Sequence, residues 1–156
     1  MDLLEPHIHS GRGVAFKADN GKWLSLMGPT TRRNLEAYKD AKDGWCRFEI
    51  EKVDEESVYL KSPTDNNRYL SRIYSGGVNY IWSAKTTPDP ACLFKVYKDN
   101  GMISFLGSNN KYLGRFDRGG VQNIESVKDG IDFTSRFIVE SYDPGKFGKN
   151  LIRIPS

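Results

Sequence analysis

The fold is decided by one phrase that occurs three times, as FKADNGKWL at residues 16–24, LKSPTDNNRYL at 60–70 and LGSNNKYL at 106–113. Each copy runs from an apolar residue through an Asn-rich turn to a basic residue, an aromatic residue and a leucine. The aromatic residues Trp23, Tyr69 and Tyr112 stand 46 and 43 residues apart. Because self-similarity with a period of about 20–50 residues indicates repeat architecture, we interpret the chain as three related units.

Two further markers follow the same spacing. The phenylalanines Phe48, Phe94 and Phe137 stand in CRFEI, CLFKV and SRFIV, again 46 and 43 residues apart. Between the aromatic residue and the phenylalanine of each unit lies a weak strand pattern, NLEAY at 34–38, YIWSA at 80–84 and NIESV at 123–127. Insertions would have to respect all three markers at once, so we do not attribute the repeat to chance.

Pairs of turn residues separate short apolar runs along the chain. The pairs are Asn20-Gly21, Asn66-Asn67, Gly76-Gly77, Asn100-Gly101, Asn109-Asn110 and Gly119-Gly120. Asn and Gly tolerate the positive φ that tight hairpins require. Short strands with frequent turn signals favour an all-β sandwich or barrel. Four strands in each of three units predict a β-trefoil, a six-stranded barrel closed at one end by three hairpins.

The repeated apolar residues are expected to form the core near the three-fold axis. They are the aromatic–leucine pairs Trp23-Leu24, Tyr69-Leu70 and Tyr112-Leu113, and the phenylalanines Phe48, Phe94 and Phe137. One unit cannot bury its apolar face alone, whereas three together can. Each buried Phe contributes about 1.5–3 kcal/mol to stability.

The 156 residues fit one domain, which we place at residues 13–140. Residues 1–12 are expected to be a flexible N-terminal segment, and residues 141–156 a C-terminal tail or one extra strand. The sequence lacks a secretory signal pattern, so we expect a cytoplasmic or nucleocytoplasmic protein. It has no apolar stretch near the ~20 residues of a membrane span, so we expect no membrane insertion.

Charge and cysteine content exclude other classes. The net charge of +3 is too small to predict nucleic-acid binding. Cys46 and Cys92 occupy equivalent places in units one and two, where each is expected to pack as a small apolar group rather than form a disulfide.

The motifs of common enzyme classes do not occur in this sequence. It contains no Gly-x-Ser-x-Gly elbow, no phosphate-binding loop and no Cys-x-x-Cys. His7 and His9 have no third ligand nearby, so we predict no metal site. Nothing singles out two carboxylates as a glycosidase pair. We therefore predict a non-enzymatic protein that has no cofactor.

The second unit departs most from the repeat and supplies the candidate site. Within eleven residues it contains Arg72, Tyr74, Asn79, Tyr80 and Trp82. Sugar recognition needs this mixture, because aromatic faces stack on the C–H patch of a pyranose while Asn and Arg form directional hydrogen bonds to hydroxyls. Strand alternation puts Tyr80 and Trp82 on one face, which is either a binding face or the core. Residues 115–120 of unit three are the second candidate segment.

The chain resembles the amaranthin-type plant agglutinins. The resemblance covers roughly residues 13–140 and rests on these motifs: residues 14–24, Lys61-Ser62, residues 68–70, NYIWSA at 79–84 and ACLF at 91–94. It implies a β-trefoil lectin with a plant stress or defence role. The implied partners are glycans or glycoproteins of the galactose/N-acetylgalactosamine type, bound at a homodimer interface. Residues 74–82 match the binding loop, so Asn79 and Tyr80 are the implied contacts.

The chain also departs from that family. The founding lectin has two tandem trefoils, whereas this chain has one, and Gly76-Gly77-Val78 stands where the family has a proline-containing turn. The alternative is a protein-interaction trefoil of the fascin-like or inhibitor type, for example one that binds actin. Similar Asn-rich turns occur in fascin-like domains, so the two interpretations stay open at this stage.

Overall fold

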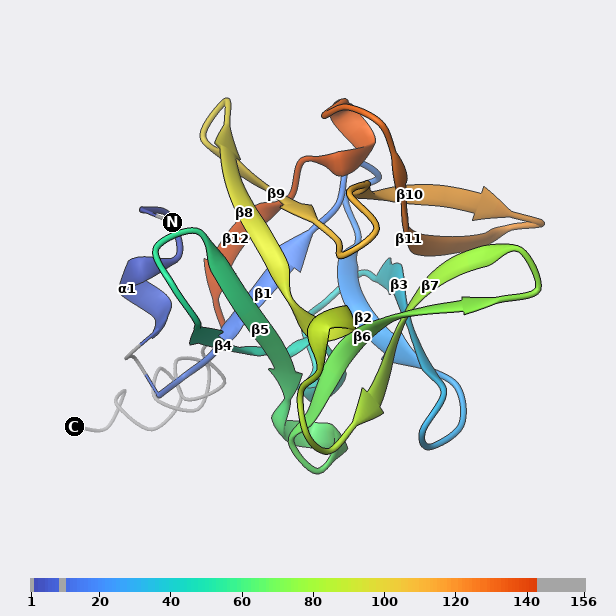
Figure 1. Cartoon of the computed structure of the whole chain (residues 1–156), viewed down its shortest axis with the longest axis horizontal. Helices are drawn as coiled ribbons and strands as arrows, with labels where there is room; N and C mark the ends of the chain where they lie inside the picture. Colours follow the sequence, from blue (N-terminus) through green and yellow to red (C-terminus); the bar gives the residue numbers. More distant parts are fainter. Residues whose placement is uncertain (1, 9–10, 143–156) are drawn as a thin grey trace, which may run out of the picture.

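The computed structural model describes residues 2–8 and 11–142, and these form an all-β fold of twelve strands (Figure 1). Unit one contains β1 (Val14–Lys17), β2 (Trp23–Met27), β3 (Arg33–Lys39) and β4 (Glu49–Lys52). Unit two contains β5 (Ser57–Ser62), β6 (Arg68–Ser75), β7 (Val78–Lys85) and β8 (Phe94–Asp99). Unit three contains β9 (Met102–Leu106), β10 (Tyr112–Arg118), β11 (Val121–Lys128) and β12 (Ile138–Ser141). The predicted strand count and the four-strand repeat are confirmed.

Six strands form the barrel. β1 pairs with β12, β5 with β4 and β8, and β8 with β9, all antiparallel. Two bridges complete the closure, Val14 with Phe48 and Ile103 with Phe137. Closing the sheet on itself leaves few unpaired edges.

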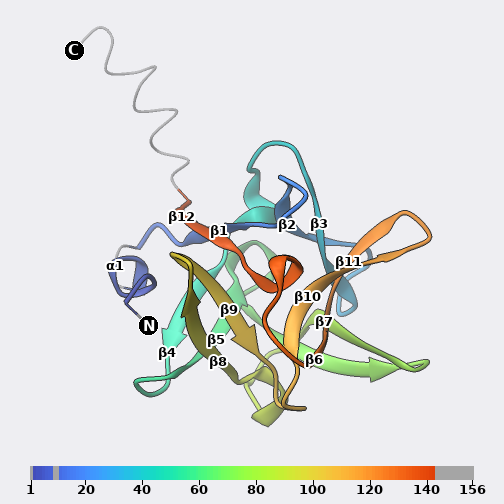
Figure 2. The ribbon, with the colours of Figure 1, turned by 90° about the horizontal axis from the view of Figure 1, so that it is seen from above.

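The other six strands form three hairpins that cap one end of the barrel. The hairpins are β2–β3, β6–β7 and β10–β11, and the second strands β3, β7 and β11 also pair with one another. The tips of β6–β7 and β10–β11 lie on the side opposite α1 (Glu5–Ile8) in two perpendicular views (Figures 1 and 2). This is the predicted β-trefoil.

Phenylalanines from all three units meet inside the barrel. The Phe105 ring lies 5.4 Å from Phe16 and 6.3 Å from both Phe94 and Phe137. The three repeated phenylalanines and the three repeated leucines are all buried, as predicted: Phe48, Phe94, Phe137, Leu24, Leu70 and Leu113.

The aromatic partners of those leucines do not join this core, which corrects the expectation. Successive side chains of a strand point to opposite faces, so an inward leucine turns its neighbour outward. Tyr69 and Tyr112 are therefore half-buried on the outside. The Tyr69 hydroxyl donates to Glu51 at 2.9 Å. Trp23 is buried, but in a separate cluster with Ala15, Cys46 and Tyr142.

Each unit has one short 3-10 turn before its last strand. The turns are η1 (Gly44–Cys46), η3 (Pro90–Cys92) and η4 (Phe133–Ser135), and unit two has one more, η2 (Pro63–Asp65). The side chains of Asp43, Asp89 and Asp132 accept from the backbone N–H two residues on. Such N-caps satisfy otherwise unpaired donors.

The two cysteines lie in equivalent capped turns. Both are free and buried. Each Sγ donates to its capping aspartate at 3.6 Å, Cys46 to Asp43 and Cys92 to Asp89. Burial raises the pKa of both thiols, so both are protonated at neutral pH.

Residues on both sides of the expected domain, 13–140, contact the barrel. Glu5–Ile8 form one helical turn, and Leu4 is fully buried against the barrel. At the other end β12 runs to Ser141, and the N–H of Tyr142 donates to the carbonyl of Gly13 at 3.0 Å. The apolar residues 151–154 lie outside the described residues. In the described part of the chain, every helix is too short to cross a membrane.

Candidate functional site

The β6–β7 hairpin separates the five predicted site residues onto two faces. In its register Arg72 lies opposite Ile81 and Tyr74 opposite Asn79, whereas Ile73 lies opposite Tyr80. Side chains that are paired across two strands share a face, and the next pair lies on the other face. The predicted residues therefore do not form one site.

Arg72, Tyr74 and Asn79 share the face that carries the core residue Ile81. The Arg72 guanidinium donates to Asn79 Oδ1 at 2.8 Å and to Ser108 Oγ at 3.0 Å. These bonds connect the β6–β7 hairpin to a turn of unit three. Tyr74 is 67% exposed near the hairpin tip. Because Arg72 and Asn79 are held in a contact between units, their first role is structural.

Unit three repeats that contact. Arg115 donates to both carboxylate oxygens of Asp19 in unit one, at 2.7 and 2.8 Å, and also bonds Gln122. Arg115 and Gln122 take the places of Arg72 and Asn79. The presence of Arg72 and Asn79 on this face of the β6–β7 hairpin is therefore explained by the repeated contact between units, and no ligand is needed to account for it.

Tyr80 and Trp82 lie on the opposite face and are half-buried. Their rings stack with centroids 5.3 Å apart at an angle of 27°. Ile81, between them in sequence, points the other way and is fully buried in the core. The question left open by the sequence is thus answered: neither ring belongs to the core, and both keep part of their surface accessible.

Unit three brings polar groups to these rings. Tyr80 lies directly opposite Glu125 in the pairing of β7 with β11. Arg118 donates to both carboxylate oxygens of Glu125, at 2.5 and 2.9 Å, and its guanidinium lies 4.5 Å from the centroid of Phe116. Tyr80, Trp82, Phe116, Arg118 and Glu125 together are called the cap surface below. The first and second candidate segments therefore meet in one place.

A polar network continues the cap surface across the three-fold axis. Asn34 Nδ2 donates to Glu36 and to Asn123 Oδ1, at 3.0 and 2.7 Å, and Asn123 Nδ2 donates to Glu125 at 3.0 Å. Among the buried side-chain nitrogen and oxygen atoms of the described residues, only Asn34 Oδ1 has no hydrogen-bond partner. Symmetry is broken here, because units one and three have Asn-x-Glu where unit two has Tyr80 and Trp82.

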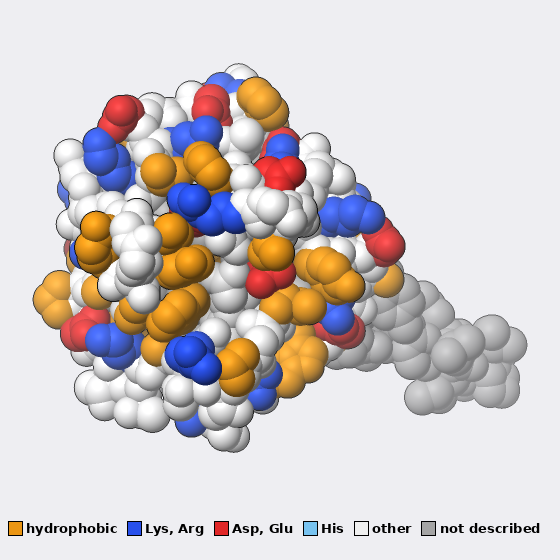
Figure 3. Space-filling view, turned by 90° about the vertical axis from the view of Figure 1, so that its right-hand side faces the viewer, with side chains coloured by type: hydrophobic (Ala, Val, Ile, Leu, Met, Phe, Trp, Pro, Cys, Tyr) orange, Lys and Arg blue, Asp and Glu red, His pale blue; other side chains and the backbone are white. Residues whose placement is uncertain are grey.

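The face with the hairpin tips gathers apolar side chains around several basic ones (Figure 3). Phe116 is exposed, and the Arg118 side chain is 39% exposed, whereas the Glu125 side chain is only 1% exposed. A buried carboxylate that receives two guanidinium hydrogen bonds fixes Arg118 in a defined orientation. The cap surface thus combines aromatic faces with a fixed donor group.

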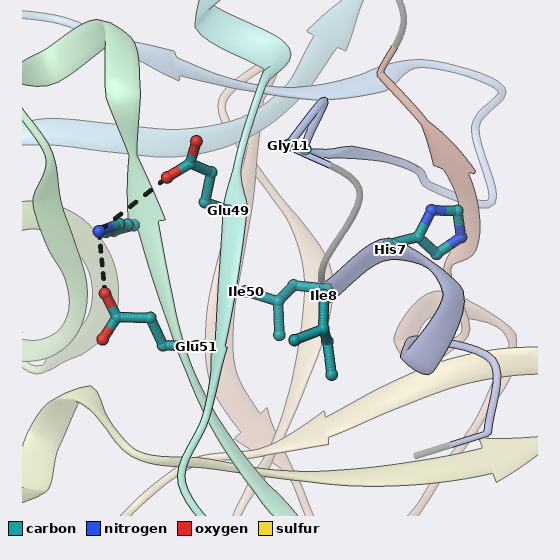
Figure 4. A pocket seen from close by; sticks show the side chains of 8 residues that line it. His7, Ile8, Gly11, Glu49, Ile50 and Glu51 are labelled. Carbon is teal, nitrogen blue, oxygen red and sulfur yellow. Dashed lines mark ion pairs between the residues drawn. The ribbon is translucent and has the colours of Figure 1, made fainter.

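Another hollow lies on the opposite side of the molecule, between α1 and β4 (Figure 4). Its volume is about 260 Å³. The ammonium of Lys61 lies between Glu49 and Glu51, at 4.0 and 2.9 Å, and Arg47 also pairs with Glu49 at 3.4 Å, so two cations face the two carboxylates. Burial lowers the pKa of His7 at its rim. The described residues contain no group of three or more metal-ligating side chains.

No protein-family model matches the chain, and no curated protein matches it. The designed three-fold symmetric protein ThreeFoil is similar over 81% of this chain and 96% of its own, with a TM-score of 0.69 and 10% identity. A Polyporus squamosus lectin, bound to the human-type influenza-binding epitope Neu5Aca2-6Galb1-4GlcNAc, is similar over 83% of this chain, with a TM-score of 0.69 and 13% identity. This chain spans about half of that lectin, 49%. At these identities the likeness establishes the β-trefoil fold, while the amaranthin-type assignment stays a resemblance.

Proposed function

We propose that this chain is a non-enzymatic carbohydrate-binding module, and that its ligand lies on the cap surface. The observation that carries the proposal is the stacked pair Tyr80–Trp82 beside the Arg118–Glu125 ion pair. A lectin among its structural neighbours, which is bound to a glycan and shares this fold over about half of its length, supports the proposal.

The chemistry of a pyranose fits these groups. One side of the ring presents C–H groups, which pack on aromatic faces such as Trp82 and Phe116. Its hydroxyls form directional hydrogen bonds and need fixed partners. Arg118 is held by Glu125, so little side-chain freedom is lost when a ligand binds.

We further propose that the ligand is a neutral glycan of the galactose/N-acetylgalactosamine type, which the family resemblance implies. The polar network presents two carboxylates, Glu36 and Glu125, against one guanidinium, Arg118. Among the described residues, Glu36 has no ion-pair partner. An anionic sugar would meet a net negative charge near the axis, whereas hydroxyls and an amide N–H find acceptors there.

One chain supplies the whole cap surface, from units two and three. The homodimer implied by the resemblance is therefore not needed to complete the site. Its role would be to hold two cap surfaces in one particle, as cross-linking of glycans requires. Size-exclusion chromatography with light scattering tests the dimer separately from binding.

A glycan array tests the function. The wild-type chain is expected to bind neutral galactose-type glycans saturably. Trp82→Ala is expected to weaken this binding, because it removes the aromatic contact of the cap surface, while its circular dichroism spectrum stays that of the wild type. A silent array together with actin co-sedimentation would favour the protein-interaction alternative, for which the exposed Tyr74 at a hairpin tip is the supporting observation.

A further inference from the structure

Each unit has a β-bulge at the same place, where the aromatic–leucine pair meets the second strand of the hairpin. In unit one Trp23 pairs with Lys39 and Leu24 with Ala37, so Tyr38 has no partner. The same shift leaves Ala84 unpaired in unit two and Val127 unpaired in unit three. A bulge re-aims the extra side chain away from the regular sheet face.

Only unit one has an aromatic residue at its bulge. Tyr38 is 58% exposed and lines a hollow of about 420 Å³. The other lining residues are Asn20, Lys22, Ala37, Lys39, Asp40 and Gln122. Packing does not explain an exposed tyrosine here, because units two and three fold with Ala84 and Val127 in its place.

Polar groups from units one and three line the hollow beside the ring. Lys22 and Asp40 form an ion pair at the rim, with side chains that are 40% and 85% exposed. Gln122 comes from unit three, and its Oε1 accepts from Arg115, which Asp19 holds in turn. Its amide group is thereby oriented. The Lys39 ammonium, paired with Asp43 at 2.9 Å, lies 5.8 Å from the centroid of Tyr38.

The hollow is separate from the cap surface. Gln122 and Asn123 are neighbours in β11 and therefore point to opposite faces of it. Asn123 belongs to the polar network of the cap surface, whereas Gln122 lines the hollow. A ligand in one place does not occupy the other.

We propose that this hollow is a second saccharide site, specific for a neutral pyranose with two adjacent hydroxyls. One hydroxyl donates to Asp40 and its neighbour accepts from Lys22, while the C–H side of the ring packs on Tyr38. The Gln122 amide supplies a third contact. This inference rests on the proposed function. It makes one chain bivalent, so that a monomer would cross-link glycans without a second copy.

Native mass spectrometry measures the number of sugars bound per chain. The probes are the methyl glycosides of galactose, N-acetylgalactosamine, glucose and mannose. Across these four probes, the wild-type chain is expected to bind sugar at two sites, the cap surface and the hollow at Tyr38. Tyr38→Ala and Trp82→Ala are each expected to remove one of them, and the double variant both. Val127→Ala shortens the side chain at the equivalent bulge of unit three. It is the matched control and is expected to keep both bound sugars.

The outcomes separate the two proposals. One bound sugar that is lost in Trp82→Ala and unchanged in Tyr38→Ala overturns the second site alone. One bound sugar that is lost in Tyr38→Ala and unchanged in Trp82→Ala overturns the cap surface and keeps the site at Tyr38. No binding of any of the four probes by the folded wild type overturns the second site, and a silent glycan array would overturn the function as well.

Discussion

Tyr74 and Tyr80 belong to the same hairpin but lie on opposite faces of it, because Tyr74 pairs with Asn79 and Tyr80 follows in the next pair, with Ile73. Two tyrosines of one segment thus form a matched test. Tyr80→Ala is expected to weaken saccharide binding about tenfold or more, since a central aromatic contact is worth about 1–2 kcal/mol. Tyr74→Ala is expected to change it less than about twofold. Isothermal titration calorimetry measures both, and the reverse ranking would move the site to the other face.

Arg118 and Glu125 are expected to be coupled energetically. Removing Arg118 leaves Glu125 buried with only the Asn123 amide as partner. Loss of one partner of a buried pair lowers the free energy of unfolding, and the partial exposure of Arg118 reduces the size of the effect. Glu125→Gln in the Arg118→Ala background should recover part of that loss. A double-mutant cycle by urea unfolding measures the coupling; additive effects would show that the ion pair does not stabilise the cap.

Phe105 is expected to be critical for stability, because its ring contacts those of Phe16, Phe94 and Phe137. Phe105→Ala should lower the free energy of unfolding by about 3–5 kcal/mol. Phe133→Ala is the matched control, since Phe133 is 65% exposed and should change it by less than about 0.5 kcal/mol. Equal effects in denaturant unfolding would contradict the assigned core.

Acid is expected to destabilise the capped turns. The hydrogen bond from Lys85 holds the pKa of Asp89 below its ordinary value of 3.8. For Asp43, partial burial acts in the opposite direction, but hydrogen bonds from Lys39 and from the backbone N–H of Trp45 outweigh it and lower the pKa. A carboxyl whose pKa is depressed in the folded state stabilises it above the unfolded pKa. That stability is lost as the pH falls through the folded pKa.

The free energy of unfolding should therefore fall below about pH 4, in the window set by those lowered values. Asp89→Asn keeps a side-chain acceptor for the turn but cannot titrate. Its free energy of unfolding should decline less than that of the wild type between about pH 5 and 3. Urea unfolding across that range makes the comparison, and identical acid profiles would refute the assignment to Asp89.

The repeat predicts the fold because each unit supplies the same inward residues. Leu24, Leu70 and Leu113 recur in register with the three phenylalanines, so the barrel and its three hairpins follow from spacing alone. The prediction fails for Tyr69 and Tyr112, since a leucine and the residue before it cannot both point inward from one strand. Strand alternation allows only one residue of each aromatic–leucine pair to face the core, and this rule predicts the outward position of the two tyrosines.

The candidate site was less accessible to sequence reasoning. Proximity along the chain grouped Arg72, Asn79 and Trp82, whereas the register places Trp82 on the other face. Glu125 of unit three pairs with Tyr80 of unit two. A sequence pattern within one unit cannot predict a contact between two units. For Tyr38 the sequence does contain a usable signal, because an aromatic residue stands where the other two units have Ala84 and Val127. Sugar specificity, the homodimer and the cellular location stay predictions.

The most direct measurement of the central claim is a ¹H–¹⁵N NMR titration with the best saccharide from the glycan array. Side-chain signals report on each face of the β6–β7 hairpin. The indole N–H of Trp82 reports on the cap surface, and the side-chain amide of Asn79 reports on the opposite face. We predict that the Trp82 signal shifts saturably with ligand while the Asn79 side-chain signal stays in place. A saturable shift of Asn79 with Trp82 unmoved would contradict the account.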